Sequence, residues 1–191
     1  MIQFDDLYKT HKDRIEGFIR RMVRDATLAQ DLTQETFIRA QKGLKEFRGE
    51  ASPLTWLFRI ANNLCLDHLR QKKGREKMVD FFEYLDDQPQ EEMVFSKNGE
   101  HNQMVSLERE EMSQCVQEFV ERLPESYRAA MVLFYIEDFP IEEIAKILGV
   151  SSGSVRVRLH RAREELRALL KEGCDFGRDE RNVFVCNRKE K

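Results

Sequence analysis

The 191-residue chain carries 32 Lys and Arg against 35 Asp and Glu, a formal net charge of −3, and is 41% hydrophobic and 35% charged. Nine glycines and four prolines favour a soluble, helix-rich protein over a sheet-rich or fibrous one. No apolar run approaches the roughly 18 residues that a membrane span needs, and the N-terminus lacks the basic and apolar segments of a signal peptide. We therefore expect a cytoplasmic protein of two compact helical domains joined by a linker.

The charge is distributed unevenly along the chain. Residues 39–75 hold nine Lys and Arg against three Asp and Glu, a net charge of +6, and residues 152–171 hold six against two, a net charge of +4. Residues 76–111 hold three against eleven, a net charge of −8. Two basic blocks separated by an acidic one indicate two contacts with a polyanion and a spacer that avoids it.

Hydrophobic residues at helical spacing predict the first two helices. Those from Phe4 to Met22 recur every three or four residues and predict a helix over residues 2–24. In the next segment Phe37 and Ala40 face inward by the same criterion. The opposite face of this second helix is acidic and amide-bearing, with one apolar member: Asp31, Gln34, Glu35 and Ile38. The pattern alone leaves open whether this face is solvated or binds a partner.

A third helix is predicted from Ser52, which can cap free backbone amides, and Pro53, which suits a first helical turn. Leu57 and Ala61 face inward, and the other side of the helix is polar and basic. Periodicity then fades over residues 74–106, where acidic residues and turn-forming dipeptides accumulate, as is typical of a linker.

The last two predicted helices have the pattern of a helix-turn-helix. A short helix over residues 141–148, a turn, and a longer helix over residues 152–171 follow one another. Ala145 permits close helix approach, Gly149 tolerates the turn, and Val155 anchors the second helix. The outward side of the longer helix carries side chains suited to a DNA major groove: Arg156, Val157, His160 and Arg161.

These motifs resemble a known family. Four segments are similar to region two of the extracytoplasmic-function (ECF) sigma factors, within the sigma-70 family: Asp31 to Phe37, Phe47-Arg48-Gly49, Thr55 to Ala61 and Asp67 to Arg70. Three more resemble region four of the same family: Leu123-Pro124, residues 141–150, and Gly153 to Arg156 with Arg161 to Arg163. The resemblance implies an all-α fold with a region two domain over 1–73, an acidic linker over 74–106 and a region four domain over 107–171.

The resemblance further implies a transcription initiation factor that lends promoter specificity to core RNA polymerase and is not an enzyme. It places core polymerase on the face of the second helix formed by Asp31, Gln34, Glu35 and Ile38, and region four on the polymerase flap. Many relatives are held inactive by an anti-sigma factor, so we expect such a partner. We predict no membrane insertion, no cofactor and no metal.

Promoter DNA is expected at two places. By the resemblance, the loop around residues 47–53 and the third helix capture the unpaired non-template strand of the minus-ten element through amides and cations: Arg48, Arg59, Asn62, Asn63, Arg70, Lys72 and Lys73. The resemblance likewise implies that the recognition helix reads the minus-thirty-five duplex, where Arg suits guanine and Val a thymine methyl: Ser154, Arg156, Val157, Arg158, His160 and Arg161.

The C-terminal tail, residues 172–191, extends past the family pattern. Cys174 and Cys186 lack CxxC spacing, which is weak evidence for zinc, and we predict a disordered tail. A dimeric helix-turn-helix repressor is the alternative function, but it gives residues 1–73 no purpose. An enzyme is not favoured, because the sequence shows neither a nucleophile and base at suggestive spacing nor a Gly-rich phosphate loop.

Overall fold

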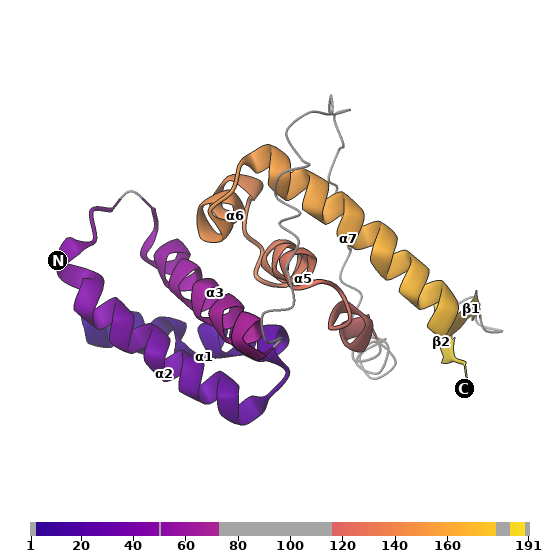
Figure 1. Cartoon of the computed structure of the whole chain (residues 1–191), viewed down its shortest axis with the longest axis horizontal. Helices are drawn as coiled ribbons and strands as arrows, with labels where there is room; N and C mark the ends of the chain where they lie inside the picture. Colours follow the sequence, from indigo (N-terminus) through magenta and orange to yellow (C-terminus); the bar gives the residue numbers. More distant parts are fainter. Residues whose placement is uncertain (1–2, 50, 73–115, 179–183, 190–191) are drawn as a thin grey trace.

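The computed structural model describes residues 3–49, 51–72, 116–178 and 184–189. The N-terminal region is a bundle of three helices and one short 3-10 turn: α1 (Phe4–Val23), α2 (Ala26–Gly43), η1 (Leu44–Glu46) and α3 (Pro53–Lys72). In the C-terminal region, described from residue 116, residues 116–120 are helical. Short helices, a π-helical turn and one long helix follow: α5 (Glu125–Met131), η2 (Val132–Ile136), α6 (Ile141–Leu148) and α7 (Ser152–Gly173). Figure 1 shows α5 and α6 between α3 and α7.

The predicted acidic linker, residues 74–106, lies outside the described residues, as does Lys73. The predicted domain boundaries at residues 73 and 107 therefore stay predictions. Within the described part of the chain, no helix combines the length and the apolarity needed to cross a membrane.

Capping residues explain where two of the helices in the N-terminal bundle begin. The Asp25 carboxylate accepts a hydrogen bond from the Leu28 amide at 3.0 Å, and Ser52 Oγ accepts one from the Thr55 amide at 3.0 Å. Each contact satisfies a backbone donor that the first helical turn leaves free. The predicted start of the third helix at Ser52 and Pro53 is confirmed.

The helix-turn-helix also forms as predicted. Gly149 ends α6 with a left-handed φ of 68°, a conformation that strains any residue with a Cβ. Ser151 Oγ then accepts a hydrogen bond from the Ser154 amide at 3.1 Å and begins α7. Val155 and Leu159 are fully buried, which fixes α7 against the rest of the C-terminal region.

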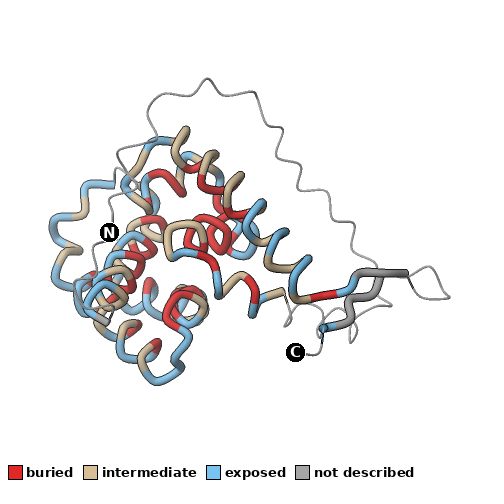
Figure 2. Tube along the Cα trace, turned by 45° about the vertical axis from the view of Figure 1, so that its right-hand side comes forward, coloured by how far each residue is buried: buried red, intermediate tan, exposed pale blue. Residues whose placement is uncertain are grey.

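The N-terminal and C-terminal regions pack on one another, which the sequence did not predict. The rings of Phe58 in α3 and Phe139 after η2 meet edge to face with centroids 4.9 Å apart. The buried Arg128 guanidinium donates to the Met22 carbonyl at the end of α1 over 2.6 Å. Burial lowers the pKa of Arg128, and nearby Arg24 lowers it further. Figure 2 shows buried residues where the helices of the two regions meet.

The prediction of a disordered tail is wrong for two short segments. Strands β1 (Cys174–Arg178) and β2 (Phe184–Arg188) form an antiparallel pair in which Cys174 lies opposite Arg188. The Lys189 amide donates to the Gly173 carbonyl at 3.0 Å and ties the end of the pair back to α7. Phe184 and Val185 favour strand structure and could have predicted β2. The charged residues around them favoured the prediction of disorder instead.

Candidate nucleic-acid and polymerase interfaces

The polar face predicted on the second helix lies on the exposed side of α2. Asp31 and Gln34 are exposed, and Ile38 is 44% exposed despite being apolar. Glu35 is paired with Arg39, whose Nε lies 2.7 Å from Glu35 Oε1 one helical turn away. None of these four predicted residues contributes to the buried core described for the molecule, so the face is free to bind a partner.

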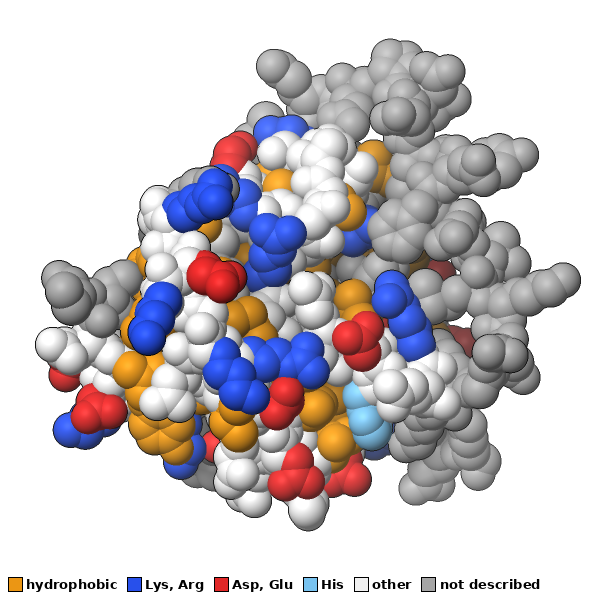
Figure 3. All heavy atoms as spheres, turned by 60° about the vertical axis from the view of Figure 1, so that its left-hand side comes forward, with side chains coloured by type: hydrophobic (Ala, Val, Ile, Leu, Met, Phe, Trp, Pro, Cys, Tyr) orange, Lys and Arg blue, Asp and Glu red, His pale blue; other side chains and the backbone are white. Residues whose placement is uncertain are grey.

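A hollow of about 530 Å³ lies where η1, the following loop and the first turns of α3 meet; we call it the α3 pocket. Its walls include two of the predicted minus-ten residues and one lysine from α6: Glu46, Phe47, Arg48, Ala51, Thr55, Trp56, Arg59 and Lys146. The rings of Phe47 and Trp56 are tilted against each other with centroids 4.9 Å apart. Figure 3 turns this end of the molecule forward and shows Lys and Arg gathered among acidic and apolar side chains.

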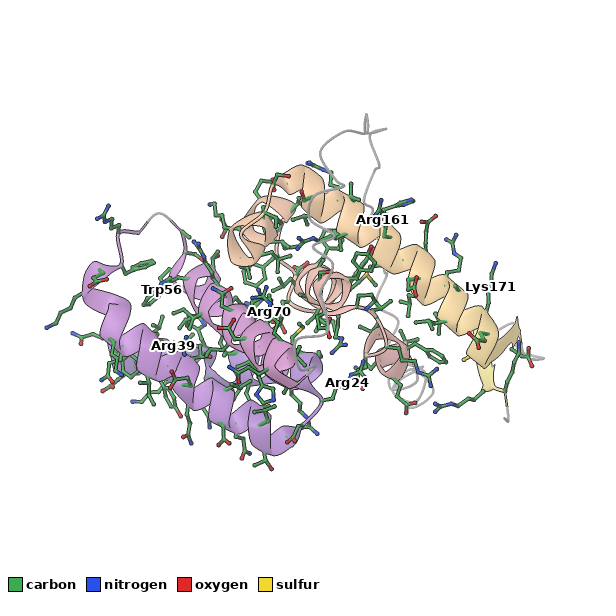
Figure 4. All side chains as sticks on the ribbon, viewed as in Figure 1. Arg24, Arg39, Trp56, Arg70, Arg161 and Lys171 are labelled. Atoms are coloured by element: carbon green, nitrogen blue, oxygen red, sulfur yellow. The ribbon has the colours of Figure 1, made fainter. Side chains whose placement is uncertain are left out.

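Trp56 lies between α2 and α3 (Figure 4) and is half-buried. A Cβ on Gly43 would stand 3.2 Å from its ring, so the glycine makes room for the indole. Aromatic faces beside arginines are the chemistry that single-stranded nucleic acid needs, because bases stack and phosphates pair with cations.

The other predicted minus-ten residues are distributed along α3. Asn63 and Arg70 are exposed, and Arg70 lies 3.7 Å from Asp67. Asn62, by contrast, is 1% exposed, and its Oδ1 accepts no hydrogen bond from any described residue. Because α3 packs against α6 as well as against α1 and α2, a wider arc of the helix is buried than one domain would require. In this packed arrangement Asn62 is not accessible to a base, and its predicted reading of a base edge stays a prediction.

The recognition helix α7 presents its predicted reading side chains at the surface. The side chains of Arg156 and His160 are 39% and 45% exposed, and Val157 is half-buried. Figure 4 shows Arg161 on the outer side of α7. The arrangement presents cations and one apolar side chain to solvent over the first turns of the helix, as a major-groove reader requires.

Two residues predicted to bind the minus-thirty-five element do not lie on the exposed reading side of α7. Arg158 is only 5% exposed, and burial lowers its pKa, so it belongs to the interior of the C-terminal region and is not available to DNA here. The side that carries it is covered because α7 packs on both α5 and α6. Ser154 lies beside the helix cap, with its Oγ 2.9 Å from Ser151 Oγ.

Contacts between α6 and the α3 pocket were missed by sequence reasoning. The Thr55 hydroxyl donates to the Glu143 carboxylate, whose other oxygen lies 3.0 Å from Lys146 Nζ. These two hydrogen bonds lower the pKa of Glu143, and the one from Thr55 contributes most. No local pattern could have revealed the contact, because Thr55 and Glu143 are 88 residues apart in sequence.

A second hollow, of about 700 Å³, is mostly apolar and is lined by the C-terminal region together with Arg21 of α1; we call it the η2 groove. Tyr135 and Ile136 at its edge are 48% and 42% exposed. The signal for it is present in the sequence, because the run from Met131 to Ile136 is apolar at six consecutive positions, more than one helix face can bury.

Comparison with known proteins identifies the family. The model "Sigma-70 region 2" matches residues 7–75, and "Sigma-70, region 4" matches residues 113–166. The ECF RNA polymerase sigma factor SigW of Bacillus subtilis is 34% identical over 88% of this chain and 89% of its own. The RNA polymerase sigma-H factor of Pseudomonas aeruginosa is 36% identical over 88% of this chain and 89% of its own. The chain belongs to the ECF sigma factors.

Two solved structures share the fold. The sigma factor RpoE of Bartonella quintana, in its complex with the anti-sigma factor NepR, is 26% identical with a TM-score of 0.63 and matches 88% of this chain and 96% of its own. CnrH in complex with the cytosolic domain of CnrY is 24% identical with a TM-score of 0.60, covers 88% of each chain, and supports the fold alone. As an ECF sigma factor the chain has region two in α1–α3 and region four in the helices from residue 116 to α7.

Membership in this family answers the competing interpretations of the sequence. A stand-alone repressor leaves the match to region two without a role, and sigma factors are not enzymes. In the portion of the chain that the structure describes, no group of three or more His, Cys, Asp or Glu side chains could hold a metal ion.

Proposed function

We propose that this ECF sigma factor directs core RNA polymerase to promoters by reading the minus-thirty-five duplex with α7 and holding the unpaired minus-ten strand in the α3 pocket. It acts in the cytoplasm and catalyses no reaction itself. The observation that carries the proposal is the combination, in one chain, of an outward-facing recognition helix and a separate pocket walled by aromatic rings and arginines. Each has the chemistry that its nucleic acid requires.

Residue roles follow from exposure. Arg156, Val157, His160 and Arg161 contact the upstream element, because they lie in the first turns of α7. Around α3, four exposed residues serve the minus-ten strand: Arg48, Arg59, Asn63 and Arg70. Lys72 and Lys73 keep the role that the sequence predicts for them. Asn62 and Arg158 are buried in this structure, so neither is included in these two sets.

Polymerase docking uses two surfaces in this proposal. The α2 face of Asp31, Gln34, Glu35 and Ile38 binds the clamp helices of the largest subunits, and its exposed isoleucine gives that contact an apolar centre. The η2 groove, with Tyr135 and Ile136 exposed, receives the polymerase flap. The RpoE structure contains an anti-sigma factor, which supports a partner of that kind here, competing for the same surfaces.

In vitro transcription tests this function. Purified chain is added to core polymerase on a fragmented genomic library, and the RNA start sites are sequenced. We expect a set of new starts that share an upstream and a minus-ten element and that are absent with core polymerase alone. If no new start sites arise, the chain is not a sigma factor of this kind.

A further inference from the structure

A third hollow, of about 500 Å³, lies where the end of α1 meets the turn before α5; we call it the arginine pocket. The charged residues of its lining are three arginines and one glutamate, an excess of two positive charges: Arg24, Arg122, Arg128 and Glu125. The rest of the lining is apolar and includes Leu69 of α3 and Leu123. None of these residues belongs to the α3 pocket or to the reading side of α7.

Arg128 is the most buried of the three arginines, at 5% exposed. Its two terminal nitrogens donate to the carbonyls of Met22 and Leu123 at 2.6 and 3.0 Å. Its Nε–H, itself buried, has no partner among the described residues. The carbonyls hold the side chain in place, but a neutral carbonyl does not cancel a positive charge that burial makes costly.

The acidic side chains nearby do not offset the charge of Arg128. Burial is the largest cause that lowers the pKa of Arg128, and Arg24 lowers it further. Glu125 and Glu121 raise this pKa, each by less than Arg24 lowers it. Glu121 Oε2 is 3.8 Å from Arg24 Nε, in a pair whose side chains are 39% and 41% exposed, and such exposed pairs are weak. An anion in the arginine pocket would therefore stabilise a cation that the protein leaves uncompensated.

Arg24 and Arg122 supply donors that a ligand can reach. Arg122 is exposed, and its guanidinium lies over the ring of Phe119, 4.9 Å from the centroid. A stacked guanidinium still directs its N–H groups outward in its own plane, where they can hold a phosphate through two hydrogen bonds. Arg24 ends α1 with a left-handed φ of 62°, and Figure 4 shows it between the N-terminal bundle and the helix over residues 116–120.

The size and the walls of the arginine pocket fit a small molecule. Pockets for such ligands enclose roughly 300–1,000 Å³, and a phosphate ester has an organic part for the apolar walls as well as an anionic group for the arginines. The pocket is also remote from the α3 pocket: residues 55 and 69 line the two pockets on the same helix, about 21 Å apart at 1.5 Å per residue.

We propose that the arginine pocket binds a small phosphorylated metabolite, of the nucleotide class, whose phosphate groups are held by Arg24 and Arg122 beside the buried guanidinium of Arg128. This site goes beyond the proposed function, which uses it for neither DNA nor polymerase. Residues of region two and of region four line it together, so a bound ligand raises the melting temperature of the chain.

The test uses three probes on the full chain: inorganic phosphate, pyrophosphate and adenosine diphosphate. The ionic strength is held constant with sodium chloride, so that general screening does not change. We expect pyrophosphate and adenosine diphosphate to raise the melting temperature and to bind one per chain in isothermal titration calorimetry. Inorganic phosphate, with fewer oxygens and less charge, should bind about tenfold more weakly. If none of the three probes changes the melting temperature, the proposal is wrong.

Arg122→Gln and Arg20→Gln form a matched pair of variants. Each removes one exposed arginine charge, and only Arg122 lines the arginine pocket. Arg122→Gln should weaken pyrophosphate binding about tenfold or more, because a charge-assisted contact is lost, and Arg20→Gln should keep the parent affinity. An equal loss in both variants would mean general electrostatic attraction and would overturn the site.

Arg24→Gly is an independent variant, because glycine accepts the left-handed backbone that this position requires. We expect a loss of pyrophosphate affinity similar to that of Arg122→Gln, with the circular dichroism of folded helices retained. If Arg122→Gln loses helicity, Arg24→Gly decides in its place. Parent affinity in Arg24→Gly would remove that arginine from the site and contradict the proposal.

A single-stranded minus-ten oligonucleotide distinguishes a metabolite site from a contact with DNA. We expect the oligonucleotide to bind without displacing pyrophosphate; displacement would place the arginine pocket on the path of the DNA and overturn the proposal. The start-site assay with core polymerase tests the sigma function separately. Its failure would leave the three binding results as they are, and loss of pyrophosphate binding would leave the start sites as they are.

Discussion

Regions two and four differ in what surrounds their DNA-binding surfaces. The reading side of α7 faces outward: Arg156 and His160 are partly exposed and lie near Glu142 and Glu164, both of region four. The α3 pocket of region two, in contrast, is lined in part by Lys146 of region four, and Thr55 on its wall donates a hydrogen bond to Glu143 of region four. The difference shows that α6 serves two interfaces, one with α7 and one with α3 beside the pocket.

The largest expected effect comes from the core that supports the recognition helix. Leu159 is fully buried, so Leu159→Asp should cost at least about 4 kcal/mol of unfolding free energy, because an unpaired charge enters an apolar site. Thermal unfolding followed by circular dichroism should show the loss of region four helices with a remaining transition from region two. Loss of all helix at once would show that the two regions unfold as one unit and would weaken the comparison.

The reading side of α7 should determine base preference without supporting the fold. Arg156→Ala and Arg161→Ala are each expected to keep the parent melting temperature. An arginine that contacts guanine through two hydrogen bonds contributes about 1–3 kcal/mol of discrimination at one base pair. Transcription from single-base variants of the upstream element measures this discrimination between bases. Unchanged base preference in both variants would place sequence reading elsewhere.

Local rules account for what the sequence predicted well. The cap at Ser52 and the turn at Gly149 depend on residues within about four positions, so both could be identified from the chain alone. Asn62 and Arg158 were assigned to DNA because each lies on the polar side of its own helix. Their burial depends on helices packed from elsewhere in the chain, such as α6 against α3, and no local pattern contains that information.

A smaller effect is expected at the α3 pocket. Arg59 is exposed, so Arg59→Ala should leave the free energy of unfolding unchanged. It should weaken binding of the minus-ten strand by about 1–2 kcal/mol. The slope of log affinity against log salt concentration should become shallower by roughly 0.7, because one phosphate contact is lost. The measurement is oligonucleotide anisotropy with the polymerase complex at several salt concentrations. Asn63→Ala is the control: it should lower affinity without changing the salt slope, because binding through an amide releases no counterion. Identical salt slopes for the parent and Arg59→Ala would mean that Arg59 does not contact a phosphate.

The smallest expected change concerns the α2 face. Glu35→Lys breaks only an exposed pair with Arg39, so its cost to stability is a few tenths of a kcal/mol. Capture of core polymerase should weaken by about 1 kcal/mol, because the reversed charge meets the surface that the parent carboxylate complements. Asp13→Lys is the control, since Asp13 is exposed on α1 and lies outside the proposed docking face. Equal capture by the parent protein and both variants, with unchanged circular dichroism, would show that the α2 face is only solvated and that polymerase binds this sigma factor elsewhere.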